Sequence, residues 1–471
     1  MKWIVIATFS MLFVTACVPT IVHKTADVTM PSNFTRLADT VSTGSVNWRT
    51  FYNDTNLIAI IDSALRHNQD LNMVLQGIDI AQNDVTAKRG EYLPFVKFRA
   101  GAGVEKSGRY TRNGAVDENV DVTPGQRLPT PLPTIDVGAD VSWEVDIWKK
   151  LRNATQASAL RYLSTIEGTN FMVTTIVAEI ASSYYELMAL DNLLDAINAN
   201  INIQKNALRI VELQKQAART TELAVKKFEA EVLKNESRRY DVQQRIIETE
   251  NHINFMAGRF PQHIDRDSKT FLDISPDSLH AGIPTQLLQN RPDVKQAELE
   301  LAATDLDIDV AKARFYPSLN IVAGIGYQAM NAQYLVSTPE SMIFSIAGEL
   351  MVPVINRNAI TASYLNASAR QIQAAYSYER TILNSYVEVA NQLAKVENTQ
   401  SSYQRKRQQV QALTESVDIA NSLFLSARAD YMEVLMTQRD ALEAKMDLIE
   451  TKSAQLHAYV NVYQALGGGW R

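Results

Sequence analysis

Four segments of the chain alternate apolar and polar residues with a period of two, as β-strands do when their two faces meet different surroundings. They cover residues 96–105, 135–146, 319–328 and, less regularly, 341–350. A half-buried strand of an ordinary sheet would show this alternation. So would a strand of about ten residues that crosses a membrane, with its apolar side toward lipid and its polar side toward water. Four strands are too few to close a barrel, so the second interpretation requires several subunits that contribute four strands each.

Two long stretches lack the residues that end helices. Residues 354–466 contain neither glycine nor proline, and only Gly168 interrupts residues 139–257. Near the C-terminus apolar residues recur every seven positions, which predicts a narrow coiled-coil seam through Leu435, Leu442, Ile449, Leu456 and Tyr463. The phase of the pattern changes at 427–430. We therefore expect two antiparallel helices of unequal length, the longer roughly 100 Å, and an equivalent turn at 217–220.

The chain also contains two copies of one unit. A shift of 223 residues places Tyr92 on Phe315, a shift of 205 places Arg152 on Arg357, and a shift of 209 places Gly258 on Gly467. Each copy reads helix, strand, loop, strand and a long helical stretch, as expected of a tandem repeat. We predict the copies at residues 48–260 and 284–471, with a linker at 261–283.

The first residues have the layout of a secretory signal peptide. Lys2 precedes an apolar stretch from Trp3 to Val14, which the small residues Thr15-Ala16 and then Cys17 follow. Residues 14–17 resemble the bacterial lipobox, in which the cysteine becomes the acylated first residue of the mature chain. We expect a signal peptide at 1–16, a lipid on Cys17 that anchors the chain to a membrane surface, and an extended tether over 17–47.

Composition removes several classes of function. The net charge of −6 without a basic block argues against nucleic acid as a partner. One cysteine excludes a disulfide framework and cysteine metal clusters. No apolar run reaches the roughly 18 residues of a membrane-spanning helix, and closed barrels of strands are the other structure that crosses membranes.

The chain carries no enzymatic pattern. Its six histidines are scattered without metal-ligand spacing. Asp305-x-Asp307-x-Asp309 imitates the start of a calcium loop, but Val310 and Tyr316 stand where that loop needs glycine and glutamate. Arg291-Pro292-Asp293 fits a helix start, where proline and an acidic residue are favoured. We therefore expect no enzyme, no cofactor and no metal site.

Several motifs together resemble the TolC-type outer-membrane channels, in particular the lipoprotein branch that serves multidrug efflux pumps. They are Ile283-Pro284, Leu287-Leu288, Arg291-Pro292-Asp293, Trp143-Glu144-Val145-Asp146, Tyr431-Met432-Glu433-Val434-Leu435 and Ala465-Leu466-Gly467-Gly468-Gly469-Trp470. The resemblance implies an α+β membrane protein that forms a homotrimer, with a twelve-stranded barrel in the outer membrane of a Gram-negative bacterium and a coiled-coil α-helical barrel in the periplasm. It also implies a periplasmic adaptor (membrane fusion) protein and an inner-membrane RND transporter as partners.

The resemblance further implies a gate and contact sites at the helix tips. Glu433 matches an acidic residue that narrows the tunnel, with Asp430 one turn before it, while Met436 replaces a second acid of some members. Ala218, Arg219, Ala427 and Arg428 match the adaptor-contacting tips. Glycine is usual where both alanines stand, and because alanine avoids positive φ, we expect a different backbone at these turns. Surface acids on a helix and plain exposed turns are the alternatives.

Two other functions stay open at this point. The same duct could serve a type I protein-secretion system, although Cys17 and Arg291-Pro292-Asp293 favour the efflux branch. A periplasmic coiled-coil scaffold lipoprotein without a pore is the alternative from another class. The alternating strands argue against it, because a scaffold has no use for a lipid-facing surface.

Overall fold

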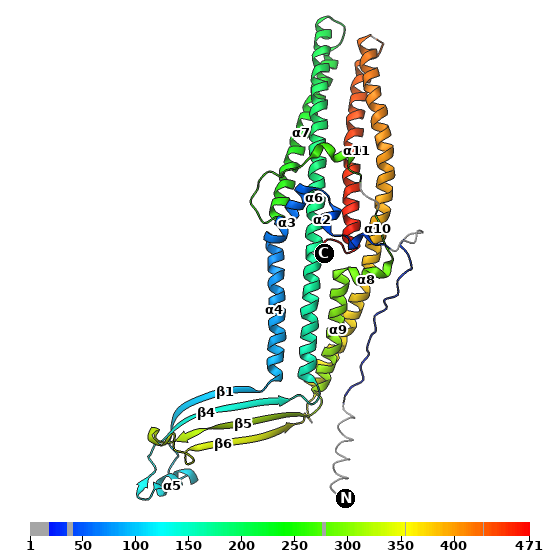
Figure 1. Ribbon diagram of the computed structural model, residues 1–471. Coiled ribbons are helices and arrows are strands. Elements are labelled where there is room, and N and C mark those ends of the chain that lie inside the picture. The colour runs from blue at the N-terminus through cyan, green and yellow to red at the C-terminus, as the bar shows by residue number, and fades with distance from the viewer. Residues whose placement is uncertain (1–17, 35–40, 276–278, 354, 427) are drawn as a thin grey trace. The chain divides into compact units, whose positions relative to one another are not determined.

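The computed structural model describes residues 18–34, 41–275, 279–353, 355–426 and 428–471. The chain forms two compact units (Figure 1). Of the described residues, the sheet unit contains 18–25 and those within 79–163 and 299–376, and the hairpin unit contains those within 26–78, 164–298 and 377–471. Cys17 lies outside the described residues.

The sheet unit is built on one antiparallel sheet of four strands. Its order is β1 (Phe95–Glu105), β4 (Leu132–Val145), β5 (Ser318–Ala329) and β6 (Met342–Met351). All four strands predicted from the alternation are confirmed, with ends that differ by three residues or fewer. Strands from both halves of the chain thus join in one sheet, since β4 of the first half pairs with β5 of the second.

The connection between β1 and β4 is more ordered than the loop expected there. It contains α5 (Arg112–Asn119) and a small hairpin of β2 (Asp121–Thr123) and β3 (Gln126–Arg127). The corresponding connection between β5 and β6 holds only the short helix η4 (Ala332–Tyr334) among its described residues. These elements are too short to show a periodic pattern, which is why the sequence did not predict them.

Two helical hairpins of unequal arms follow the strands, as predicted. The first joins α6 (Lys150–Gln216, 67 residues) to α7 (Glu222–Met256, 35 residues), and the second joins α10 (Asn358–Leu425, 68 residues) to α11 (Tyr431–Ala465, 35 residues). The helices that precede the strands are α4 (Gln69–Tyr92) and α9 (Pro292–Ala313). In the part of the chain that the structure describes, no helix combines the length and apolar character needed to cross a membrane.

The core of the hairpin unit confirms the predicted seven-residue seam. Its five members on α11, from Leu435 to Tyr463, are all buried. The short helices α2 (Trp48–Phe51) and α3 (Thr55–His67), near the start of the chain, complete this core, and η1 (Thr43–Ser45) precedes them. The ring of Phe51 stacks on that of Tyr463 at 4.0 Å. Asp54 starts α3 by accepting hydrogen bonds from the backbone N–H groups of Asn56 and Leu57, as an N-cap does.

Equivalent glycines end the shorter arm of each hairpin. Gly258 and Gly467 have φ of 67° and 85°, values that favour glycine. In both places the next N–H reaches back five residues, from Arg259 to Asn254 O and from Gly468 to Tyr463 O, each at 3.0 Å. This is the Schellman ending of a helix. The expected equivalence of the two glycines is confirmed, as is the helix-ending role of the glycines after Leu466.

The Arg291-Pro292-Asp293 motif joins three helices of the hairpin unit. Pro292 is the first residue of α9, as predicted, and Arg291 follows η3 (Pro284–Gln286) and α8 (Leu287–Asn290). The buried Arg291 guanidinium binds Asp293 at 3.0 and 2.8 Å, Glu388 of α10 at 2.8 Å and the Ala465 carbonyl of α11 at 2.8 Å. Burial opposes its charge, but these partners outweigh that effect and raise the Arg291 pKa.

Candidate functional site: sheet faces, hairpin tips and linker

The register of the sheet places most apolar side chains on one face and most polar side chains on the other. Residues directly opposite each other share a face, and the pairs Phe98 with Ala139, Ala139 with Ile325, and Ile325 with Phe344 run across all four strands. On this apolar face the side chains of Phe98, Phe344 and Ile346 are 90%, 76% and 80% exposed. An exposed apolar surface that spans a whole sheet marks a surface made to contact lipid or another protein.

Aromatic residues collect where the strands meet the helices of the sheet unit. The Trp148 ring stacks on Tyr316 at 4.7 Å, and its Nε1–H donates to the Pro317 carbonyl at 2.8 Å. The Trp143 Nε1–H donates to the Tyr92 carbonyl at 3.1 Å. Aromatic rings with a polar tip are typical of the boundary between lipid and water.

At the first hairpin tip the backbone differs from our expectation. Ala218 adopts φ of 55°, so the prediction that alanine would avoid a positive φ here is wrong. The Arg219 N–H donates to the Gln214 carbonyl at 2.8 Å, the same five-residue return that ends α7 and α11. This hydrogen bond and an ion pair between Lys215 and Glu222 close the turn and hold the strained residue. The hydrogen bond with Lys215 also lowers the pKa of Glu222.

The second tip has the matching hydrogen bond, from the Arg428 N–H to the Leu423 carbonyl at 2.9 Å. Ala427, the remaining tip residue predicted to contact an adaptor, lies outside the described residues. Arg219 and Arg428 are both exposed. The structure therefore places both arginines at the turn between the arms of a hairpin, where an incoming protein can reach them.

The two acidic residues predicted for a gate lie at the start of α11. Asp430 is its N-cap, with a carboxylate oxygen 3.4 Å from the Met432 nitrogen, and Glu433 is in the first turn. Both side chains are exposed, as is Met436. Asp430 thus has a capping role of its own, whereas the Glu433 carboxylate reaches solvent from the first turn, where a negative charge is favoured.

A small apolar cluster ties the two tips of the hairpin unit together. Its buried members are Val211, Ala224, Val225 and Phe228 of the first hairpin and Leu435 of the second. Tyr431 and Met432, which lie between the exposed Asp430 and Glu433, pack against it. A movement of the first turn of α11 that carries Glu433 with it would therefore repack this cluster, because close-packed side chains do not slide independently.

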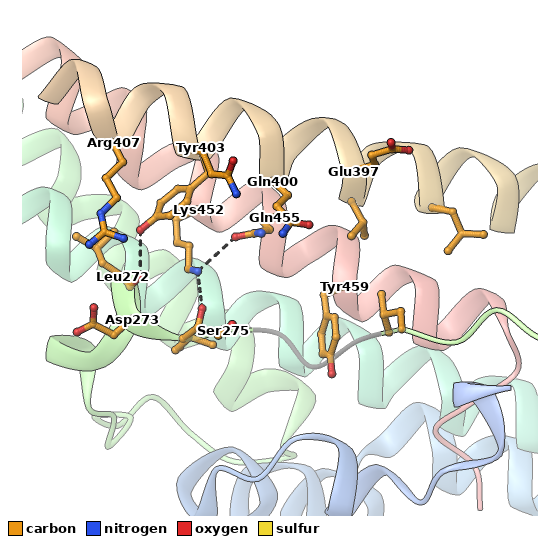
Figure 2. A pocket seen from close by; sticks show the side chains of 15 residues that line it. Leu272, Asp273, Ser275, Glu397, Gln400, Tyr403, Arg407, Lys452, Gln455 and Tyr459 are labelled. Carbon is orange, nitrogen blue, oxygen red and sulfur yellow. Dashed lines mark hydrogen bonds between the residues drawn. The ribbon is translucent and has the colours of Figure 1, made fainter. Parts of the chain in front are cut away.

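The linker between the two halves is fastened to the second hairpin. A pocket of about 710 Å³ lies between linker residues 272–275 and 279 and helices α10 and α11. Figure 2 shows the side chains that line it. The buried Lys452 ammonium of α11 donates to the Ile274 carbonyl and, at 3.3 Å, to Gln455. The Tyr403 hydroxyl of α10 donates to the Leu272 carbonyl at 3.0 Å. Burial lowers the pKa of Lys452, although the nearby Asp273 opposes the shift.

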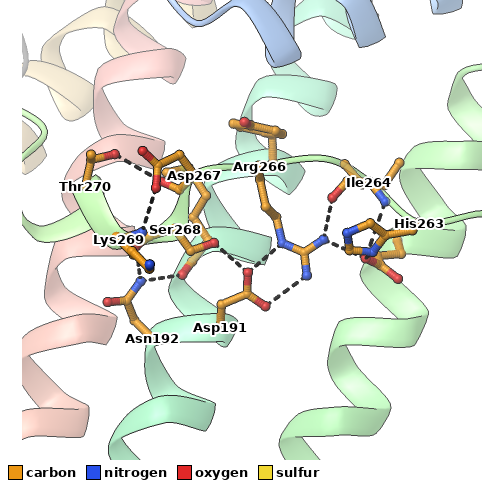
Figure 3. A network of polar contacts seen from close by, with 12 residues as sticks. Asp191, Asn192, His263, Ile264, Arg266, Asp267, Ser268, Lys269 and Thr270 are labelled. Atoms are coloured by element: carbon orange, nitrogen blue, oxygen red, sulfur yellow. Dashed lines mark hydrogen bonds and ion pairs between the residues drawn. The ribbon is translucent and has the colours of Figure 1, made fainter.

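The same linker is fastened to the first hairpin by Arg266, beside helix η2 (Ser268–Asp273). Its buried guanidinium binds Asp191 of α6 at 2.6 and 2.9 Å and Glu250 of α7 at 2.6 Å (Figure 3). Ser268 adds a hydrogen bond to Asp191 at 2.5 Å. Burial opposes the charge of Arg266, but these bonds raise its pKa. Neither Arg266 nor Lys452 belongs to a periodic pattern, so neither role could be predicted from residue spacing.

Residues 18–34, which we call the strap, contain neither helix nor strand, but they bind to other parts of the chain. In the sheet unit, Val18 and Ile21 pack against Phe315 and Tyr364. Gln371 holds Lys24 by two hydrogen bonds, accepting from its N–H at 3.2 Å and donating to its carbonyl at 2.8 Å. Within the hairpin unit, Phe34 stacks on Tyr386 at 5.3 Å.

No metal site emerges from the acidic motif of α9. The Asp305 carboxylate lies 3.0 Å from the His23 ring, and Asp307 forms an ion pair with Arg161. Among the described residues, no three His, Cys, Asp or Glu side chains are grouped so that they could hold a metal ion. The motif instead fastens the strap and α6 to α9.

Comparison with known proteins shows to which family the chain belongs. The sequence profile of the outer membrane efflux protein family matches residues 60–259 and 283–468, most of both halves of the chain. The chain belongs to this family. It is accordingly an outer-membrane efflux protein, with the mixed helical and sheet fold that the motifs had implied.

Individual members of the family match over most of their length. The solvent efflux pump outer membrane protein SrpC of Pseudomonas putida is 24% identical over 438 residues, which cover 91% of this chain and 89% of that protein. The probable outer membrane lipoprotein SilC of Salmonella typhimurium is 23% identical and covers 90% and 88%. The open state of the Neisseria gonorrhoeae MtrE outer membrane channel superimposes with a TM-score of 0.82 at 18% identity, over 97% of this chain and 99% of that one. This last likeness shows the shared fold.

Proposed function

We propose that the protein is the passive, trimeric outer-membrane duct of a tripartite pump that exports drugs or other small molecules. The observation that carries the proposal is the sheet, with one exposed apolar face across four strands and aromatic residues at the ends of its strands. Strands of 10 to 14 residues are long enough to cross the apolar part of an outer membrane. The similarity to SrpC, which belongs to a solvent efflux pump, supports small-molecule efflux over protein secretion.

The edges of the sheet support a trimer. Strands β1 and β6 each have one neighbouring strand in the sheet, so each has an open side. In a membrane an open edge is excluded because its backbone groups would have no hydrogen-bond partner. Three copies, edge to edge, close a barrel of twelve strands. Val417 and Phe424 of α10 are only half-buried, which leaves room for a neighbouring copy to cover them.

We further propose the roles of the ends of the chain and of the helices. Cys17 carries the lipid after removal of residues 1–16, by analogy with the lipoprotein SilC. The exposed Arg219 and Arg428, with Ala218 and Ala427 beside them, contact a periplasmic adaptor that couples the duct to an inner-membrane RND transporter. Glu433, with Asp430, lines the closed end, since rings of carboxylates favour cations at a constriction.

Conductance of the purified full-length protein in planar lipid bilayers tests the proposal. A duct gives discrete current steps, whereas a scaffold lipoprotein gives none. The variant Glu433→Ala should open more often or prefer cations less, because it removes the exposed charge at the tip. Asp447→Ala on the same helix, also exposed and acidic, is the matched control. Unchanged opening and selectivity in Glu433→Ala would remove Glu433 from the gate while leaving the duct in place.

A further inference from the structure

A charged fork lies on the polar face of the membrane sheet. The Arg99 guanidinium of β1 reaches over to β4, where its Nε lies 2.7 Å from Asp136 Oδ2 and its Nη1 lies 2.7 Å from Asp140 Oδ2. In the register Arg99 is directly opposite Gly138, midway between the two aspartates. One cation of β1 is therefore held between two anions of the adjacent strand, β4.

Glycines beneath the fork allow it to lie flat. Gly101 is opposite Asp136 and Gly324 is opposite Asp140. A Cβ atom on Gly101 would come within 2.6 Å of Asp136 Oδ1, and one on Gly324 within 2.8 Å of Asp140 Oδ1. Each carboxylate thus occupies the space that a side chain would take on the neighbouring strand, and the fork stays close to the sheet.

The fork carries one more negative charge than positive charge. Arg99 carries a single positive charge, and its two partners carry two negative ones. Around it, the same face holds the carboxylates Glu105, Glu144 and Glu349 and the cation Lys97. Lys97 leans over the ring of Phe95, 5.6 Å from its centroid, and Glu144 pairs with Lys150 of α6. The side chains of the fork remain partly open to solvent, Arg99 at 48% and Asp140 at 35%.

We propose that the fork of Arg99, Asp136 and Asp140 is a second charge filter of the duct, located in the membrane and separate from the gate at the tip. This rests on the proposed function, in which the polar face lines the lumen. Three copies then form a ring with three uncompensated negative charges, which favours passage of cations over anions. Because the fork lies on rigid paired strands and flat against the wall, it biases the charge of permeating solutes without narrowing the path.

Opposite variants should shift selectivity in opposite directions. Arg99→Gln removes the cation and should raise the K⁺ to Cl⁻ permeability ratio. Asp136→Asn combined with Asp140→Asn leaves an unpaired arginine and should lower the ratio by about twofold or more. The shift should grow at about 0.01 M salt and shrink at 1 M, because screening shortens the reach of the ring.

The measurement is the reversal potential of full-length protein in planar bilayers under a KCl gradient. Only inserted channels carry current, so misfolded chains do not affect the value, and the single variants Asp136→Asn and Asp140→Asn provide smaller shifts of the same sign. Asp140→Glu, which keeps the charge, and Asp62→Asn, which breaks the pair between Arg49 of α2 and Asp62 of α3, are controls that should leave the ratio unchanged. Shifts that are absent, or of the same sign in both opposite variants, would overturn the filter. Absence of current from the unaltered protein would instead overturn the proposed function.

Discussion

At the first hairpin tip, Ala218 holds a left-handed backbone conformation that costs a residue with a Cβ atom about 1–2 kcal/mol. The turn is kept because the Arg219 hydrogen bond and the Lys215–Glu222 pair fix the residues on either side. Strain of this kind is tolerated where surrounding structure enforces it. The first tip is therefore a place where a single substitution can stabilise the protein.

We predict that Ala218→Gly stabilises this tip by about 0.5–1 kcal/mol, the relief of strain less the greater freedom that glycine gives the unfolded chain. Hydrogen exchange of backbone amides in residues 213–224 should slow about two- to fivefold, because exchange follows the population of the open tip. Ala217→Gly is the matched control. Its φ is not positive, so that variant should exchange faster, and equal effects of both variants would contradict the role of strain.

Single residues were the scale at which the sequence predicted least. The apolar heptad residues of α11 and the helix-ending glycines can be recognised from their spacing in the sequence, and they lie where expected. Arg266 and Lys452 do not, because what defines them is a partner far along the chain, such as Asp191 or Ile274. For Ala218 the general preference of alanine for negative φ led to a wrong prediction, because the surrounding turn determines its φ.

Among the larger elements, the strap is more firmly packed against the protein than its composition predicted. Its prolines and small polar residues predicted a tether, and residues 18–34 contain neither helix nor strand. Yet Val18, Ile21, Met30 and Phe34 all pack against apolar clusters. Val22 and Val28 of the same segment are exposed, so apolar residues alone did not show which side chains bind the segment to the protein.

We predict that Gln371→Ala releases the strap near Lys24. The variant loses both hydrogen bonds to the Lys24 backbone, worth about 1 kcal/mol each, so the local open state should become about tenfold or more populated. Trypsin cleaves after lysine, and cleavage at Lys24 should accelerate by that factor when it follows the open population.

The matched control for the strap is Gln408→Ala, an exposed position on the same helix, α10. It should leave trypsin cleavage at Lys24 unchanged. If Gln371→Ala and Gln408→Ala are cleaved at equal rates, the two hydrogen bonds do not hold the strap.

For the whole molecule, the two faces of the sheet predict that lysine at two neighbouring positions of β6 has very different effects on assembly in the membrane. Phe344 is on the apolar face and Ser345 on the polar one, opposite Gly324. Phe344→Lys places a charge against lipid, at a cost of about 2–4 kcal/mol per chain near the middle of the membrane. Ser345→Lys places the same charge toward water and next to Asp140 across Gly324.

The readout is the amount of folded protein in outer-membrane fractions, judged by its heat-dependent mobility in gels. Phe344→Lys should reduce it severely and Ser345→Lys only slightly. The reverse order would mean that the apolar face is not the one in contact with lipid.

The two open strand edges have a consequence for how the protein must be made. A chain with unsatisfied backbone groups along both β1 and β6 can pair with any strand it meets, including the wrong one. Its stability therefore depends on how many copies are nearby, because association adds to the stability of the folded chain by mass action. A melting temperature measured on dilute protein would describe assembly as much as folding, and a cell that makes too few copies at one place would accumulate chains open to aggregation.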